Sequence, residues 1–182
     1  GERTMLNFIG HLSGVATLTR TFVEAAHGLG VAIACTRKTT PGLRALEKRA
    51  VRLGGGGAHR HGLHDAILIK DNHIAAAGGV AEALERAHRS AGHLCAIEVE
   101  VDTLEQLDQA LPFAPRAVLL DNFSLADLKT AVKLARGKTL LEASGGITIE
   151  NVRAVAETGV DVISVGALTH SVKSLDVGLD AL

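Results

Sequence analysis

The sequence lacks the long apolar segments of membrane proteins and the cysteine content of disulfide-stabilised secreted domains. No apolar run approaches the ~20 residues that a helix needs to span a bilayer, and no signal-peptide pattern is visible. Only two cysteines occur among the 182 residues, Cys35 and Cys95, and both lie in short apolar runs typical of strands. We interpret them as reduced core thiols, which predicts a cytoplasmic protein.

The chain also has almost no net charge. Its 19 Lys and Arg residues nearly balance its 20 Asp and Glu residues, which gives a formal net charge of -1 at pH 7. This balance gives no support for nucleic-acid binding or for attraction to a membrane surface, so neither partner is expected. Hydrophobic residues make up 47% and charged residues 21%, which excludes a disordered chain. No linker or low-complexity tract is visible, so residues 1–182 are expected to form one domain.

Six short apolar runs carry the main structural signal. Continuous runs of this kind are typical of parallel strands that are covered on both faces. They occupy residues 31–35, 66–69, 95–97, 117–120, 140–141 and 162–165. Helical patterns lie between them at 12–29, 43–53, 79–91, 104–111, 125–134 and 148–159. This alternation predicts an open or incomplete TIM-like α/β barrel of about six parallel strands, fewer than the eight of a full barrel.

Local signals add detail to the expected helices. Thr103, with Asp102 before it, and Ser124 are the expected N-caps of the two helices that follow them. Pro41 is placed in the first turn of the 43–53 helix, where proline is tolerated. One face of that helix is expected to carry its apolar residues, which are Leu43, Leu46, Ala50 and Leu53.

Nearly every apolar run ends in charged or polar residues, the layout of an α/β-barrel active site. Residues 36–42, which begin Thr36-Arg37-Lys38, follow the first run and form an anion site or an ordinary charged loop. Glycine loops follow the last two runs, as in the phosphate-binding place of such barrels. Those loops contain Ser144, Gly145 and Gly146, and then Gly166 and Ala167, with His170 nearby. The mixture suits a substrate rich in phosphate and carboxylate groups.

Several of these residues admit more than one interpretation. Lys70 either binds an anion, forms a Schiff base as in barrel aldolases, or is structural. Glu98 and Glu100 share one face of their strand, with Val99 opposite. With Asp121, these carboxylates anchor Mg²⁺, stabilise a developing cation, or pair with nearby cations. The residues His59, His61 and His64 could bind a metal, but a cationic wall built by His59 and Arg60 for a carboxylate is favoured.

The chain resembles the quinolinate phosphoribosyltransferase family over essentially its whole length. The resemblance rests on residues 2–4, 12–17, 36–42, 55–60, 70–73, 98–100, 120–122, 142–147 and 164–170. It implies an open α/β barrel that transfers a phosphoribosyl group from phosphoribosyl pyrophosphate to quinolinate, with loss of carbon dioxide, in NAD biosynthesis. It also implies a Mg²⁺ requirement and a homodimer or higher homo-oligomer. Family members carry an N-terminal sandwich domain, so residues 1–12 are expected to lead in from a domain that this sequence lacks.

The resemblance also implies roles for individual residues. Quinolinate would be held by Arg3 of a neighbouring subunit and by Thr36, Arg37, His59, Arg60 and Lys70. Phosphoribosyl pyrophosphate would be held by Lys38, Glu100, Asp121, Ser144, Gly145, Gly146, Gly166, Ala167 and His170. Glu100, Asp121 and Lys70 would be catalytic, and Glu100 and Asp121 would bind Mg²⁺. The alternatives are a lysine-dependent aldolase and a non-catalytic phosphate-binding barrel. Lys70-Asp-Asn-His73 argues against the molybdenum-associated relatives of the same fold.

Overall fold

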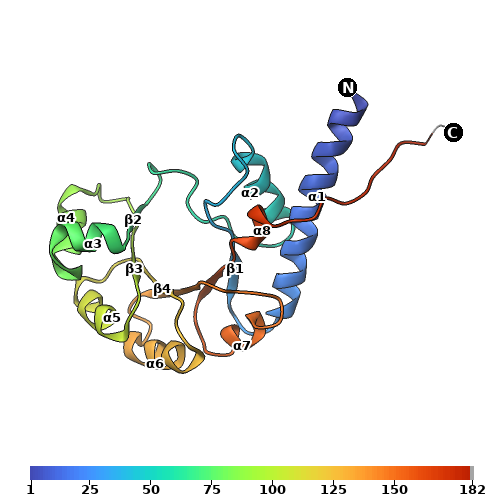
Figure 1. Cartoon of the computed structure of the whole chain (residues 1–182). Helices are drawn as coiled ribbons and strands as arrows, with labels where there is room; N and C mark the ends of the chain where they lie inside the picture. The colour runs from blue at the N-terminus through green and yellow to red at the C-terminus, as the bar shows by residue number, and fades with distance from the viewer. Residues whose placement is uncertain (181–182) are drawn as a thin grey trace.

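Six parallel strands curve into an arc that does not close. The computed structural model describes residues 1–180, and its sheet has the order β1-β6-β5-β4-β3-β2. The strands are β1 (Ala32–Ala34), β2 (Ile67–Ile69), β3 (Ile97–Val101), β4 (Ala117–Asp121), β5 (Leu140–Ser144) and β6 (Val162–Ser164). The edge strands β1 and β2 do not pair with each other (Figure 1). The prediction of an incomplete barrel of six parallel strands is therefore confirmed.

Helices line the outside of this arc (Figure 1). They are α1 (Glu2–Ala25), α2 (Arg44–Leu53), α3 (Asp71–Ala77), α4 (Val80–Ser90), α5 (Leu104–Ala110), η1 (Leu111–Phe113), α6 (Leu125–Ala135), α7 (Val152–Ala156) and α8 (Ala167–His170). The predicted caps of α5 and α6 form: Thr103 Oγ1 accepts the Gln106 N–H at 3.2 Å, and Ser124 Oγ accepts the Asp127 N–H at 3.1 Å. Among the described helices, none combines the length and apolar content that a membrane crossing requires.

The core lies between the outer face of the sheet and the helices. It includes Val99, Val118, Leu120 and Ile163, whose exposure is 0%. Alternation along a strand turns the neighbouring side chains to the inner side of the arc. On that side Glu98 Oε2 lies 2.9 Å from His59 Nε2, and Glu100 makes an ion pair with Lys70. The expected shared face of these two carboxylates is confirmed.

Several predicted boundaries differ from those observed. Helix α1 begins at Glu2 instead of residue 12, so residues 2–12 are part of one continuous helix. The third strand begins at Ile97, because residues 92–95 form a turn closed by the Cys95 N–H on the Gly92 carbonyl at 2.9 Å. Cys95 therefore precedes the strand and is half-buried, while Cys35 follows β1 and is buried. Both are free thiols.

Helix α2 buries only part of the expected apolar face. Leu46 and Leu53 are 42% and 76% exposed, whereas Glu47 and Lys48 are completely buried. The two charged side chains are tolerated because each has fixed partners: Glu47 bonds the His11 ring at 2.8 Å, and Lys48 bonds backbone and thiol acceptors described below. Pro41 also lies before the helix, in the turn that leads to the N-cap Leu43. Of the other two predicted residues, Ala50 is buried and Leu43 is half-buried. The prediction for this helix was therefore correct in its extent and only partly correct in the face that it buries.

Candidate active site

A cavity of about 390 Å³ opens at the carboxyl ends of the strands. Residues from all six strands or the loops after them line it, together with two residues from the segment between α2 and β2. The lining residues are Thr36, Arg37, Lys38, His59, Arg60, Leu68, Lys70, Glu100, Leu119, Asp121, Glu142, Ser144 and Ser164. The position agrees with the place where parallel α/β folds bind ligands. The loops thus bring together most of the side chains that the sequence predicts for the site.

Arg44, the first residue of α2, holds two cavity loops in place. Its Nη2 donates to the Arg37 carbonyl and its Nη1 to the His61 carbonyl, both at 3.3 Å, and its Nε donates to Thr39 Oγ1 at 3.0 Å. At the other side of the loop, Thr169 Oγ1 donates to the Lys38 carbonyl at 2.7 Å. The loop after β1 is therefore tied both to the 57–66 segment and to the loop after β6.

Arg37 and Arg60 place two unsatisfied guanidinium donors at the cavity. The Nε atoms of both side chains are buried and have no hydrogen-bond partner. Arg60 uses only Nη1 locally, donating to the Ala66 carbonyl at 3.3 Å. Burial, and then the charge of Arg37, lower the pKa of Arg60. A buried donor without an acceptor costs about 1–3 kcal/mol, so this pair of cations is arranged for an anionic ligand that supplies acceptors.

Lys70 follows β2 and Asp121 ends β4, on either side of β3, and the charge of each is partly compensated. Lys70 Nζ donates to Glu100 Oε2 at 2.6 Å, and the Lys70 side chain remains 44% exposed. The Lys70 N–H donates to His73 Nδ1 at 2.9 Å, which ties the end of β2 to the first turn of α3. Asp121 Oδ2 accepts the Asn122 side-chain amide at 2.8 Å. Glu100 and Asp121 both line the cavity and offer oxygen donors, the ligand type that Mg²⁺ prefers.

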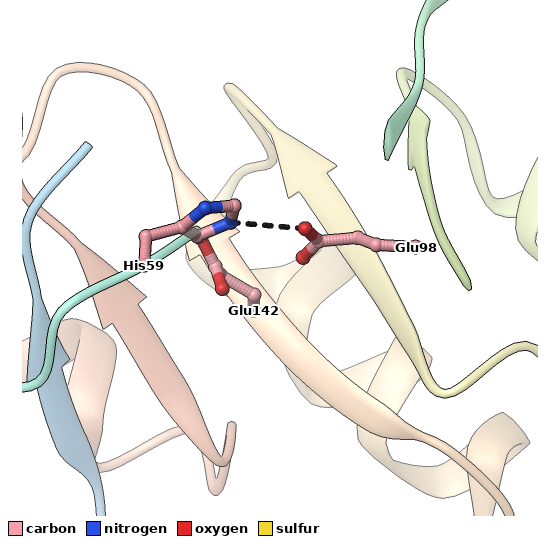
Figure 2. A group of neighbouring side chains, drawn as sticks. All are labelled: His59, Glu98 and Glu142. Carbon is pink, nitrogen blue, oxygen red and sulfur yellow. Dashed lines mark hydrogen bonds and ion pairs between the residues drawn. The ribbon is translucent and has the colours of Figure 1, made fainter. Parts of the chain in front are cut away.

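His59 lies between two buried carboxyl groups (Figure 2). Its Nε2 lies 2.9 Å from Glu98 Oε2 and 3.6 Å from Glu142 Oε1. The hydrogen bond to Glu98 raises the pKa of His59. Burial, and then the charge of Glu98, raise the pKa of Glu142 to about 7. Possible ligand atoms of the three residues lie within 4.8 Å of one another, but the hydrogen bond places a proton where a metal ion would sit, so we interpret the group as a hydrogen-bonded cluster.

The two glycine loops differ in how strongly their backbone requires glycine. Gly145 and Gly146 have φ values of 92° and 60°, in the left-handed region that favours glycine. A Cβ at Gly145 would also overlap the Asn122 side chain. Gly166 has an ordinary φ of -66°, but a Cβ there would come within 2.9 Å of His170 Nε2. The first loop follows Ser144 and Gly166 lies close to Lys38, and both of these side chains line the cavity. Gly145, Gly146, Gly166, Ala167 and His170 are not among its lining residues.

Arg3, His61 and His64 are also absent from the lining of this cavity. Arg3 is in the first turn of α1, where it lines a separate cavity of about 170 Å³ with residues 174–177. His61 lies 3.3 Å from Arg52 Nη2, and His64 is exposed. Within residues 1–180, the structure gathers neither of these histidines into a group of possible metal ligands. The favoured interpretation of the histidine-rich segment, with His59 and Arg60 at a wall for anions, agrees with this placement.

Sequence reasoning overlooked Lys48, Glu142 and Ser164. Glu142 and Ser164 line the cavity, and the alternation of their strands could have found them, since each follows buried apolar residues. Lys48 gave no such signal because the apolar residues of α2 indicated a different buried face. Its Nζ donates to the His59 carbonyl at 2.8 Å and contacts Cys35 Sγ at 3.3 Å.

The fold and the site together define an open α/β barrel with an anion-binding mouth. Residues 15–180 match the family model described as "Quinolinate phosphoribosyl transferase, C-terminal domain". The chain therefore belongs to the quinolinate phosphoribosyl transferase family, and the resemblance inferred from its motifs is confirmed.

Individual relatives agree with this assignment. The chain is 54% identical to a nicotinate-nucleotide pyrophosphorylase [carboxylating] of Mycobacterium leprae, over 98% of this chain and 64% of the relative. It is 51% identical to a probable enzyme of the same name from Bacillus subtilis, over 99% of this chain and 62% of the relative. The crystal structure of nicotinate-nucleotide pyrophosphorylase from Ehrlichia chaffeensis superposes with a TM-score of 0.94 at 46% identity, covering 98% of this chain and 65% of that one. The chain thus spans somewhat less than two thirds of the length of these relatives.

Proposed function

We propose that the protein containing this chain transfers a phosphoribosyl group from phosphoribosyl pyrophosphate to quinolinate, giving nicotinate mononucleotide, pyrophosphate and carbon dioxide for NAD biosynthesis. The observation that carries this proposal is the pair of buried, unsatisfied Nε donors on Arg37 and Arg60. Two adjacent guanidinium groups match two adjacent carboxylates on one ring. The names of the relatives support the same substrate.

The cavity residues divide the task between the two substrates. Arg37, His59, Arg60 and Lys70, with Thr36, hold the quinolinate carboxylates and aim the pyridine nitrogen at the ribose. Lys38 and the glycine loops around Gly145 hold the phosphate groups, with Ser144, Gly146, Gly166, Ala167 and His170. Arg3 lies outside the cavity of its own chain, so in this proposal it serves the cavity of a partner subunit.

The positive charge that develops on the ribose during the reaction explains why carboxylates line the cavity. The ribose C1 becomes positive as the pyrophosphate departs, and Glu100 and Asp121 stabilise that charge from neighbouring strands. The pyridine nitrogen then bonds to C1 as the bond from C1 to pyrophosphate breaks. The quaternised ring releases its 2-carboxylate as carbon dioxide, because the cationic nitrogen stabilises the electron pair left on ring carbon 2, and that carbon then takes up a proton from water. The oxygen donors of Glu100 and Asp121 fit Mg²⁺, which when bound would neutralise charge on the departing pyrophosphate. Lys70, paired with Glu100, keeps the quinolinate carboxylates close to this centre.

We propose further that the protein acts in the cytoplasm as a homodimer. Support for self-association comes from the apolar side of α1, where Met5, Phe8 and Ile9 are 41–47% exposed. A groove of about 360 Å³ between α1 and α2 adds Leu46 and Leu53 to this surface. Exposed apolar patches of this kind are typical of interfaces. Size-exclusion chromatography with light scattering measures the oligomeric state directly, and a monomer at micromolar concentration would contradict it.

The decisive test is a product assay on the protein as its gene encodes it. Quinolinate, phosphoribosyl pyrophosphate and Mg²⁺ should give nicotinate mononucleotide and pyrophosphate in equal amounts. Nicotinate, which lacks the 2-carboxylate, is the matched control and should give no product. Pyrophosphate binding without turnover would favour a non-catalytic phosphate-binding barrel instead. An aldolase would require a desolvated Lys70, but its ion pair with Glu100 and its 44% exposure disfavour Schiff-base chemistry, and borohydride trapping would test that alternative.

A further inference from the structure

His59 is held at each of its polar atoms. Its Nδ1 accepts the Arg60 N–H at 2.9 Å, which leaves the ring proton on Nε2. Nε2 donates to Glu98 Oε2 at 2.9 Å, and the His59 carbonyl accepts from Lys48 Nζ at 2.8 Å. A side chain with both ring nitrogens and its backbone fixed has little rotational freedom. The ring is therefore presented to the cavity in one orientation.

The two carboxyl groups around the ring act from different places. Glu142 belongs to the cavity lining, whereas Glu98 is not among the lining residues and reaches His59 from β3 (Figure 2). Glu98 and Glu142 are only 9% and 5% exposed, and one oxygen of each, Oε1, has no hydrogen-bond partner. Two buried carboxylates with unpaired oxygens are unfavourable unless a proton or a cation lies between them. The His59 N–H lies at that point.

We propose that Glu98 and Glu142 set the affinity for the pyridine dicarboxylate at the His59 site: Glu98 is a positioning residue that orients the His59 imidazole through its hydrogen bond, and Glu142 places a carboxyl group beside that ring in the cavity lining. This inference rests on the proposed function, because the ligand that His59 would contact is quinolinate. Glu98 supplies the hydrogen bond that orients the ring. Glu142 supplies a carboxyl group in the cavity lining. When this group is ionised, its negative charge repels the quinolinate dianion; when it is protonated, that repulsion is absent.

The first test separates the hydrogen bond from simple stability. In the protein as its gene encodes it, Glu98→Leu removes the acceptor of the His59 N–H, and Glu98→Gln keeps a carbonyl oxygen in that place. We expect Glu98→Leu to raise the quinolinate Kd and KM about tenfold, as for the loss of a hydrogen bond to a charged group. Glu98→Gln should stay within about threefold of the unsubstituted protein, since neutral acceptors retain part of such a bond. The KM for phosphoribosyl pyrophosphate should be unchanged in both.

A control on the same strand isolates the structural component. Val99→Ala weakens the core from the opposite face of β3, where Val99 is 0% exposed. It should lower the melting temperature and leave the quinolinate Kd unchanged. If Glu98→Leu binds quinolinate as tightly as the unsubstituted protein, or if Val99→Ala weakens binding equally, the positioning role is wrong.

The second test uses Glu142→Gln, which imitates the protonated carboxyl group and remains informative if Glu98→Leu does not fold. Groups facing Glu142 are His59, Glu98 and the Ser164 hydroxyl from β6. The remaining charged groups around the cavity are Arg37, Lys38, Arg60, Lys70, Glu100 and Asp121. Above the raised pKa of Glu142, its negative charge should weaken quinolinate binding. The Kd should therefore rise between about pH 6 and pH 8 in the unsubstituted protein, and the rise should be much smaller in Glu142→Gln.

The outcomes distinguish this inference from the proposed function. No quinolinate binding by the unsubstituted protein would overturn both. Binding and turnover by the unsubstituted protein, with parallel pH profiles in Glu142→Gln and unchanged affinity in Glu98→Leu, would overturn only the positioning roles. A rise in quinolinate Kd without a change for phosphoribosyl pyrophosphate would support them, because a general loss of structure affects both substrates.

Discussion

Replacing Arg60 by lysine should weaken quinolinate binding although the positive charge is retained. The Arg60 Nε is buried without a partner, so in the free protein this donor is unsatisfied. A carboxylate that accepts from it relieves that cost and gains a charge-assisted hydrogen bond. Lysine offers a point charge without the planar fork, and its ammonium group cannot occupy both donor positions.

The expected loss can be estimated from that one interaction. A hydrogen bond to a charged group contributes about 1.5–3 kcal/mol, which corresponds to a rise in the quinolinate Kd of about 10- to 150-fold. The melting temperature of the free protein should change little, because the substitution removes the Nη1 bond to the Ala66 carbonyl but also removes a buried donor that has no acceptor. A large loss of binding with little change in melting temperature would be difficult to explain by partial unfolding.

Isothermal titration calorimetry with quinolinate measures the loss, and differential scanning fluorimetry measures the stability. Arg86→Lys is a matched control, since Arg86 lies on α4 and its Nη2 donates only to the exposed end of α3 at the Ala77 carbonyl. This control should bind quinolinate normally. A Kd for Arg60→Lys within about twofold of the unsubstituted value would show that Nε does not contact the substrate, because a lost charged hydrogen bond has a larger effect.

Three further substitutions test other parts of the site. Asp121→Asn should lower kcat about tenfold or more, because it removes charge that acts in the transition state, with little change in quinolinate Kd; a lower melting temperature with normal kcat would indicate a structural ion-pair role. Gly145→Ala should cost about 1–3 kcal/mol of folding free energy and weaken pyrophosphate binding, because its φ of 92° is strained for alanine and its Cβ displaces Asn122; Gly146→Ala, with open space around it, should be milder in both assays. Finally, the unsubstituted protein should lose stability as pH rises from about 4.5 to about 7, since the unfolded state releases the Glu142 proton first. The melting temperature of Glu142→Gln relative to the unsubstituted protein should therefore increase over that range, and a constant difference would contradict the raised pKa.

The strands and their polar ends were predictable because burial on two faces leaves a simple record in the sequence. The run at 117–120 is apolar throughout and becomes β4, and Asp121 marks its carboxyl end. Since parallel strands end at one edge of a sheet, residues distant in sequence can be assigned to one site. That argument located Arg37, Lys70 and Asp121 without any knowledge of distances.

Helix α2 shows where this kind of argument fails. Hydrophobic periodicity assumes that charged side chains face water, but Glu47 and Lys48 are completely buried and Leu53 is largely exposed. The charged pair is stabilised by partners that no local pattern contains: His11 from α1, the Thr40 N–H and the His59 carbonyl. Buried polar groups depend on such long-range contacts, so their positions cannot be obtained from the period of a single helix.

The site places its carboxylates on strands and its guanidinium groups on loops. The carboxylates of Glu98, Glu100 and Asp121 are on strands, where ladder register determines their spacing: Glu100 pairs with Leu119, two residues before Asp121. The cations of Arg37 and Arg60 are on loops, and they keep donors free. Strand-borne carboxylates cannot move apart when a positive charge develops above them, so they are already arranged for it. The guanidinium groups on loops can adjust to the carboxylates of the substrate. Arg44 and Lys48 limit that movement, because Arg44 holds the Arg37 carbonyl and Lys48 holds the His59 carbonyl next to Arg60.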